Sequence, residues 1–132
     1  MAIYSMLKNL ILVFCFGGLG SVCRYVFGLI LPTKPLNWGV LLSNFLGCLI
    51  VGFVLQLFVN RQLNEATKLM IAIGFCGGFT TFSSFSADVV DLFTQQKWLL
   101  AFGYLIVSVC IGLLGVLVGM YLGGNNSFYK IG

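Results

Sequence analysis

Hydrophobic residues run along the chain in four long blocks; both prolines fall between the first two blocks, and six of the ten charged residues lie outside the blocks. A helix needs about 20 mostly apolar residues to cross the hydrocarbon core of a bilayer. The pattern therefore predicts an all-α integral membrane protein with four transmembrane helices in a single domain, residues 1–132. The predicted spans cover about residues 9–31, 37–59, 66–94 and 98–122.

The composition excludes several classes of protein. Hydrophobic residues make up 60% of the chain and charged residues only 8%, against about 25% charged in an average globular protein. So few charges cannot cover a soluble domain. The net charge of +4 is too small and too scattered for a nucleic-acid surface.

The residues of common catalytic and metal sites are scarce. The chain has no histidine and three carboxylates, Glu65, Asp88 and Asp91, which argues against zinc, haem and histidine-based catalysis. We therefore predict that the protein is not an enzyme. All five cysteines fall inside apolar runs without a C-x-x-C pair, which is typical of small buried side chains: Cys15, Cys23, Cys48, Cys76 and Cys110.

The charges outside the spans bear on topology. The apolar run after Lys8 is too long for a secretory signal and lacks a small-residue cleavage site, so we expect a retained span. An even number of spans places both termini on one side of the membrane. The bias under the positive-inside rule is weak, which is compatible with insertion in both orientations or in one. One side carries Lys8, Arg61, Lys68 and Lys130, and the other carries Lys34, Lys97 and, within its span, Arg24.

The third predicted span has an unusual centre. It contains Gly74, Gly77 and Gly78, followed by four hydroxyl residues in five. Glycine and hydroxyl residues weaken a helix, and unpaired backbone cannot face lipid. We expect the helix to be broken between Gly77 and Ser83, exposing carbonyls for a cation and N–H groups for an anion. The alternative is that the glycines serve close helix packing.

Polar residues on the other spans form helical stripes. Tyr104, Ser108 and Gly112 share a face of the fourth span, and Asn44 lies within the second. Arg24 is costly at bilayer depth, so it must snorkel to the interface, pair with another group, or face a wet vestibule.

Phe82 and Phe85 are three residues apart, among the hydroxyl residues of the third span. A phenyl ring has a positive edge, so two rings presented edge-on can replace part of the hydration of a small anion. The alternative is that both rings are ordinary lipid-facing residues.

Three motifs closely resemble the signatures of the Fluc fluoride channels, also called the CrcB family. They are Gly-Gly-Leu-Gly-Ser-Val-Cys-Arg-Tyr (17–25), Gly-Val-Leu-Leu-Ser-Asn-Phe-Leu-Gly (39–47) and Gly-Phe-Cys-Gly-Gly-Phe-Thr-Thr-Phe-Ser-Ser-Phe-Ser (74–86). The third motif is highly specific, and the resemblance extends over essentially the whole chain.

The resemblance implies an antiparallel, dual-topology homodimer among the lipids of a bacterial inner membrane. It implies passive export of fluoride through two pores, with a structural sodium ion at the centre. By resemblance, the carbonyls of Gly77 and Thr80 hold the sodium, and Arg24 and Asp88 lie near the vestibule. The pore residues that it implies are Asn44, Phe82, Ser84, Phe85, Tyr104 and Ser108. Gly112 stands where a further hydroxyl would extend the track.

Two other functions remain open at this point. A proton-coupled exporter of cationic drugs needs a carboxylate deep in the membrane, but the aspartates lie toward the end of the third span. A non-transporting assembly subunit would use the glycine faces alone and would tolerate replacement of Phe82 and Phe85.

Overall fold

The computed structural model describes residues 2–124, and Lys130 lies outside these residues. It has four helical segments long and apolar enough to cross a membrane: Ile3–Ile30, Trp38–Val59, Glu65–Thr94 and Trp98–Leu122. The described part of the chain contains no strand. The prediction of an all-α protein with four spans is therefore confirmed.

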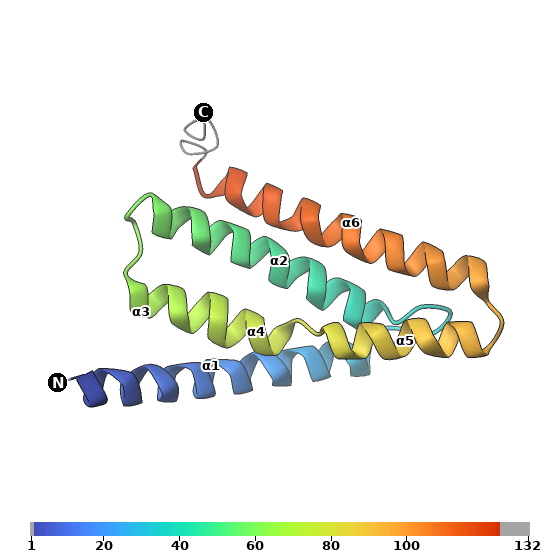
Figure 1. Ribbon diagram of the computed structural model, residues 1–132, viewed down its shortest axis with the longest axis horizontal. Helices are drawn as coiled ribbons and strands as arrows, with labels where there is room; N and C mark the ends of the chain where they lie inside the picture. Colours follow the sequence, from blue (N-terminus) through green and yellow to red (C-terminus); the bar gives the residue numbers. More distant parts are fainter. Residues whose placement is uncertain (1, 125–132) are drawn as a thin grey trace.

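Three of the spans are single helices, whereas the third is built from several pieces. The single helices are α1 (Ala2–Ile30), α2 (Trp38–Val59) and α6 (Trp98–Leu122). The third span consists of α3 (Glu65–Lys68), a π-helix η1 (Leu69–Phe75), α4 (Cys76–Phe79) and α5 (Phe82–Thr94). In Figure 1, α2 lies along α6, and α1 lies along η1 and α4.

The helix ends follow from local chemistry. Asn37, Asn64 and Thr81 precede α2, α3 and α5, and each side chain accepts a hydrogen bond from the first turn of its helix, as N-capping residues do. The first helix begins at Ala2 rather than near residue 9. No glycine or proline interrupts residues 2–9, so helical hydrogen bonding continues beyond the hydrophobic block.

Glycines allow two pairs of helices to approach backbone to backbone. A methyl group at Gly20 would collide with the Phe75 carbonyl oxygen, and one at Gly78 would collide with the Gly17 carbonyl oxygen. Both sides of this contact therefore contribute a glycine, Gly20 from α1 and Gly78 from α4. The α2–α6 pair repeats the arrangement, with Gly52 against Val116 and Gly119 against Leu49.

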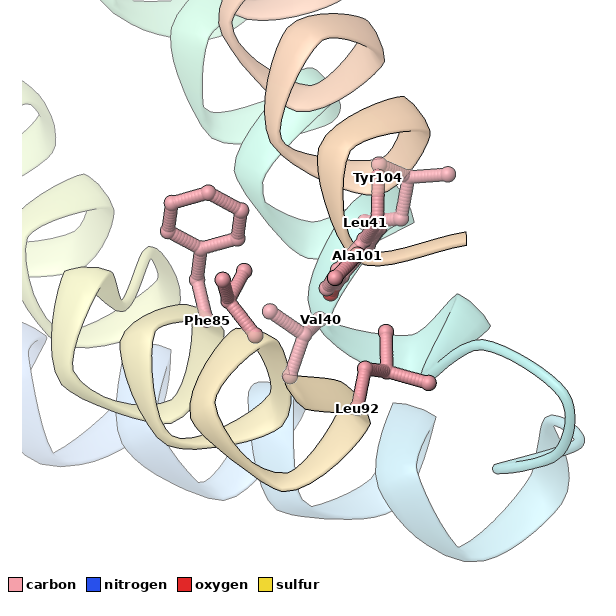
Figure 2. Packing of buried hydrophobic residues seen from close by; sticks show 7 residues of the cluster. Val40, Leu41, Phe85, Leu92, Ala101 and Tyr104 are labelled. Atoms are coloured by element: carbon pink, nitrogen blue, oxygen red, sulfur yellow. The ribbon is translucent and has the colours of Figure 1, made fainter. Parts of the chain in front are cut away.

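A small apolar core forms where α2, α5 and α6 meet (Figure 2). Its buried residues are Val40, Leu41, Phe85, Val89, Leu92, Ala101 and Tyr104. Large hydrophobic side chains cover much of the remaining surface, as expected where lipid is the solvent. The cysteines depart from the prediction: Cys76 is buried, but Cys15 and Cys110 are exposed on the single chain, where lipid takes the place of a core.

Candidate functional site

The helical path of the third span is interrupted at Thr80 and Thr81. Helix α4 ends at Phe79, and both threonines are extended, with φ/ψ of −85°/156° and −150°/118°, before α5 begins at Phe82. The interruption is shorter than the predicted segment from Gly77 to Ser83, because Gly77 and Gly78 stay helical. Gly78 packs closely against Gly17 of α1, which favours the helical form at this position.

The Asn44 amide holds the extended segment from α2. Its Nδ2 donates to the carbonyl oxygen of Thr81 at 3.1 Å, and its Oδ1 accepts from the Thr81 backbone N–H at 2.7 Å. Both main-chain groups of Thr81 therefore have a partner despite the loss of helical bonding, as a membrane protein requires.

Arg24 binds the other side of the interruption. Its Nε donates to the Gly78 carbonyl oxygen at 3.1 Å, and the Ser21 hydroxyl lies 3.4 Å from the same oxygen. A cation near the carboxyl end of a helix is favourably placed. Pairing, one of the three possibilities that the sequence left open, is therefore observed. Arg24 also lines a pocket of about 250 Å³ with Asn37 and Ser84.

Two carbonyl oxygens beside the interruption have no such partner. Within residues 2–124, no hydrogen bond reaches the carbonyl oxygens of Gly77 or Thr80. The Thr81 N–H, which would continue the helix by donating to Gly77, is taken by Asn44. Free carbonyl oxygens of this kind are suitable ligands for a hard cation.

The two phenylalanines that follow have different surroundings. Phe82 is 80% exposed on the single chain, whereas Phe85 is 8% exposed. Their ring centroids are 5.8 Å apart, with an angle of 51° between the planes. The Phe85 ring also meets Tyr104 edge-on at 5.4 Å, so the phenylalanines share one side of α5 but only Phe82 projects outward.

A groove of about 420 Å³ runs beside these rings, between α2, α6 and the interruption. The Ser108 hydroxyl oxygen is buried in its wall and has no hydrogen-bond partner among the described residues. A buried hydroxyl without a partner is unusual and costly. The groove is lined by Asn44, Cys48, Val51, Thr80, Thr81, Phe82, Phe85, Ser108, Val109, Gly112, Leu113 and Val116.

Tyr104 lies beyond this groove, toward the end of the bundle. Its hydroxyl donates to Asp88 Oδ2 at 3.5 Å, and Asn37 Nδ2 lies 3.5 Å from Asp88 Oδ1. These groups line a polar pocket of about 370 Å³. Asn37 is not among the predicted site residues, although an asparagine directly before a hydrophobic run is a recognisable N-cap signal.

The fold and the site together define the class of this protein: it is a four-span helical membrane protein with an interrupted third span and a groove that contains few polar groups. The family described as "CrcB-like protein, Camphor Resistance (CrcB)" matches residues 11–120. The chain belongs to this CrcB family.

Curated relatives match over nearly their whole length. A protein of Phocaeicola vulgatus is 39% identical over 119 residues, covering 88% of this chain and 98% of that protein. One of Gloeothece citriformis is 40% identical over 117 residues, covering 86% and 95%, and one of Acinetobacter baylyi is 40% identical over 120 residues, covering 89% and 92%. Each is named "Fluoride-specific ion channel FluC". The chain is thus a multi-pass bacterial membrane protein of a family of channels, not of enzymes.

Proposed function

We propose that the protein is a fluoride-selective channel of the bacterial inner membrane that lets fluoride leave the cytoplasm passively. The observation that carries the proposal is the unpartnered Ser108 hydroxyl in the groove beside Phe82 and Phe85. Fluoride is small and strongly hydrated, so selecting it requires nearby hydrogen-bond donors rather than a wide basic pore. No carboxylate lines this groove, which disfavours a proton-coupled carrier of cations.

The roles follow from the groups that surround the groove. The Ser108 hydroxyl and the second N–H of the Asn44 amide donate to the ion, and the positive ring edges of Phe82 and Phe85 contact it. Ser84 and Tyr104 extend the polar path toward the pocket at the end of the bundle. The charges of Arg24 and Asp88 set the electrostatic potential at the vestibules.

The working unit in this proposal is an antiparallel, dual-topology homodimer with two pores. The open side of the groove and the 80% exposure of Phe82 leave room for a second copy to complete the wall. The balanced lysine and arginine distribution suits insertion in both orientations. The interruption at Thr80 and Thr81 then lies near the middle of the membrane, buried by the partner.

A structural sodium ion is part of the same proposal. The free carbonyl oxygens of Gly77 and Thr80 fit a hard cation, and a methyl group at Gly77 meets nothing within 4 Å, so this surface is open in the single chain. Two copies related by a twofold axis would contribute the same pair of oxygens twice. The sodium would link the two subunits by neutralising carbonyl dipoles that otherwise face each other.

Fluoride efflux from liposomes tests the channel proposal. The purified protein is reconstituted, the voltage is clamped with potassium and valinomycin, and a fluoride electrode records efflux while chloride is measured in parallel. We expect rapid fluoride efflux without chloride efflux, strongly reduced in Phe82→Ile and Phe85→Ile. Phe14→Ile is the matched control, because Phe14 is also highly exposed, at 81%, but lies on α1 away from the groove.

Two outcomes would contradict the proposal. If fluoride stays trapped while the dimer is intact, the chain is not a channel, and an assembly subunit becomes the better explanation. If Phe82→Ile and Phe85→Ile conduct like the Phe14→Ile control, fluoride does not pass the two rings.

A further inference from the structure

A second groove lies on the α2–α6 pair and borders the polar pocket at the end of the bundle, since Tyr104 and Lys97 line both. It consists of two adjoining hollows of about 820 Å³ and 520 Å³, which share Trp38 and Leu41. None of its residues lines the groove that contains Ser108. Its walls are almost entirely apolar, apart from one end, where Lys97 and Gln96 lie beside Trp98.

The polar end of this groove has the features of a membrane interface. Trp38 and Trp98 are 45% and 58% exposed, and tryptophan is enriched where acyl chains meet headgroups. Lys97 directly precedes α6, and that helix begins without a side-chain cap. Its first backbone N–H groups therefore add positive potential beside the lysine.

The charge of Lys97 is available to a further partner. Its Nζ donates to the uncharged Gln95 amide oxygen at 2.6 Å, which leaves two N–H groups of the ammonium. The Gln95 amide in turn donates to Asp91 at 2.6 Å, so Gln95 lies between this carboxylate and the lysine. The groove thus combines a cationic end with a long apolar body.

We propose that this groove is a binding site for an anionic phospholipid of the surrounding bilayer. One acyl chain lies along the apolar wall from Trp98 past Leu41 toward Phe45 and Ile111, and the phosphate of a headgroup such as phosphatidylglycerol binds Lys97. Both parts of such a lipid match the groove: the long apolar wall suits the hydrocarbon chain, and the lysine suits the phosphate.

The two tryptophans make the site directly measurable. Trp38 and Trp98 are the only tryptophans of the chain, and both line the groove. Dibrominated acyl chains quench tryptophan fluorescence on contact, so quenching in bilayers of mixed composition reports the relative affinity of the groove for different lipids. The probes are dibrominated phosphatidylglycerol and dibrominated phosphatidylcholine.

We expect wild-type protein to bind phosphatidylglycerol about fivefold more strongly than phosphatidylcholine, the ratio expected for one lysine near the membrane surface. In Lys97→Gln this ratio should fall to about one, since a single ionic contact is lost. Lys8→Gln, at an exposed lysine of α1 outside the groove, should keep the wild-type ratio.

Gly103→Leu tests the apolar part of the site. Gly103 lines the larger hollow, and a methyl group there meets nothing within 4 Å, so this position has room for a side chain to project into the groove. We expect less quenching by either lipid than in Gly18→Leu, a matched change at an open glycine of α1. Circular dichroism and gel filtration establish that both variants are folded.

Either of two results would overturn the proposal. An unchanged lipid preference in folded Lys97→Gln removes the phosphate contact. Tryptophan fluorescence that neither brominated lipid quenches shows that protein, such as a second copy of the chain, covers the groove instead of lipid.

Discussion

Asn44 is the residue whose replacement tests how the helix interruption is held. Its amide makes two hydrogen bonds to the Thr81 backbone, of 3.1 Å and 2.7 Å. In Asn44→Ala both main-chain groups lose their partner in a membrane-embedded segment. An unsatisfied buried polar group costs about 1–3 kcal/mol, so we expect the free energy of unfolding to fall by about 2–6 kcal/mol.

Unfolding in mixed micelles with increasing dodecyl sulfate, followed by circular dichroism, measures this loss. Asn64→Ala is the matched control, since Asn64 also makes two hydrogen bonds, to the backbone N–H and the hydroxyl of Thr67, but at an exposed helix start. We expect that change to cost about 1 kcal/mol, as for other N-caps.

Fluoride efflux gives the second readout for the same variants. If Asn44 positions the interruption, the loss of efflux should accompany the loss of stability. Asn44→Ala protein that is as stable as wild type but conducts no fluoride would refute this reasoning, because the amide would then act on the ion alone.

Three further substitutions separate packing from conduction. Gly20→Ala should lower the free energy of unfolding by about 1–3 kcal/mol through overpacking, because its methyl group meets the Phe75 carbonyl oxygen. A methyl group at Gly18 meets nothing within 4 Å, so Gly18→Ala should instead raise the free energy of unfolding by about 0.4–1 kcal/mol. The same dodecyl sulfate titration measures both, and equal effects would disprove the close α1–η1 contact. Ser108→Ala removes a buried hydroxyl without a partner, so its stability should be unchanged or higher, while efflux should fall about tenfold if one hydrogen bond to fluoride is lost. Efflux at the wild-type rate would remove Ser108 from the pore.

Sequence patterns were informative where a property is local. Hydrophobic length is local to each block, so the four spans were predictable. Residue spacing placed Phe82 and Phe85 on one side of a helix, because helical geometry repeats within one turn. Neither pattern showed that only one ring is buried, since that depends on Tyr104, which contacts Phe85 from α6.

Properties set by distant segments were predicted incompletely. The predicted interruption includes Gly77 and Gly78, but both are helical in the structure, where Gly78 packs against Gly17 of α1, far away in the sequence. The π-helix at Leu69–Phe75 consists of ordinary apolar residues and has no distinctive local signal. The partner of Arg24 is a carbonyl oxygen 54 residues later in the chain, which no spacing rule identifies.

The distribution of hydrogen-bond partners links the fold to the proposed ions. Side chains of α1 and α2 bind the backbone at Gly78 and Thr81, on both sides of Thr80. Because the Gly78 carbonyl oxygen and both main-chain groups of Thr81 already have partners inside the subunit, these backbone groups are not free to bind an ion. The carbonyl oxygens of Gly77 and Thr80 and the Ser108 hydroxyl have none among the described residues. Groups left unpaired in a membrane need a partner from outside the subunit, and an ion held in a dimer would provide it: a cation for the carbonyl oxygens and an anion for the hydroxyl proton.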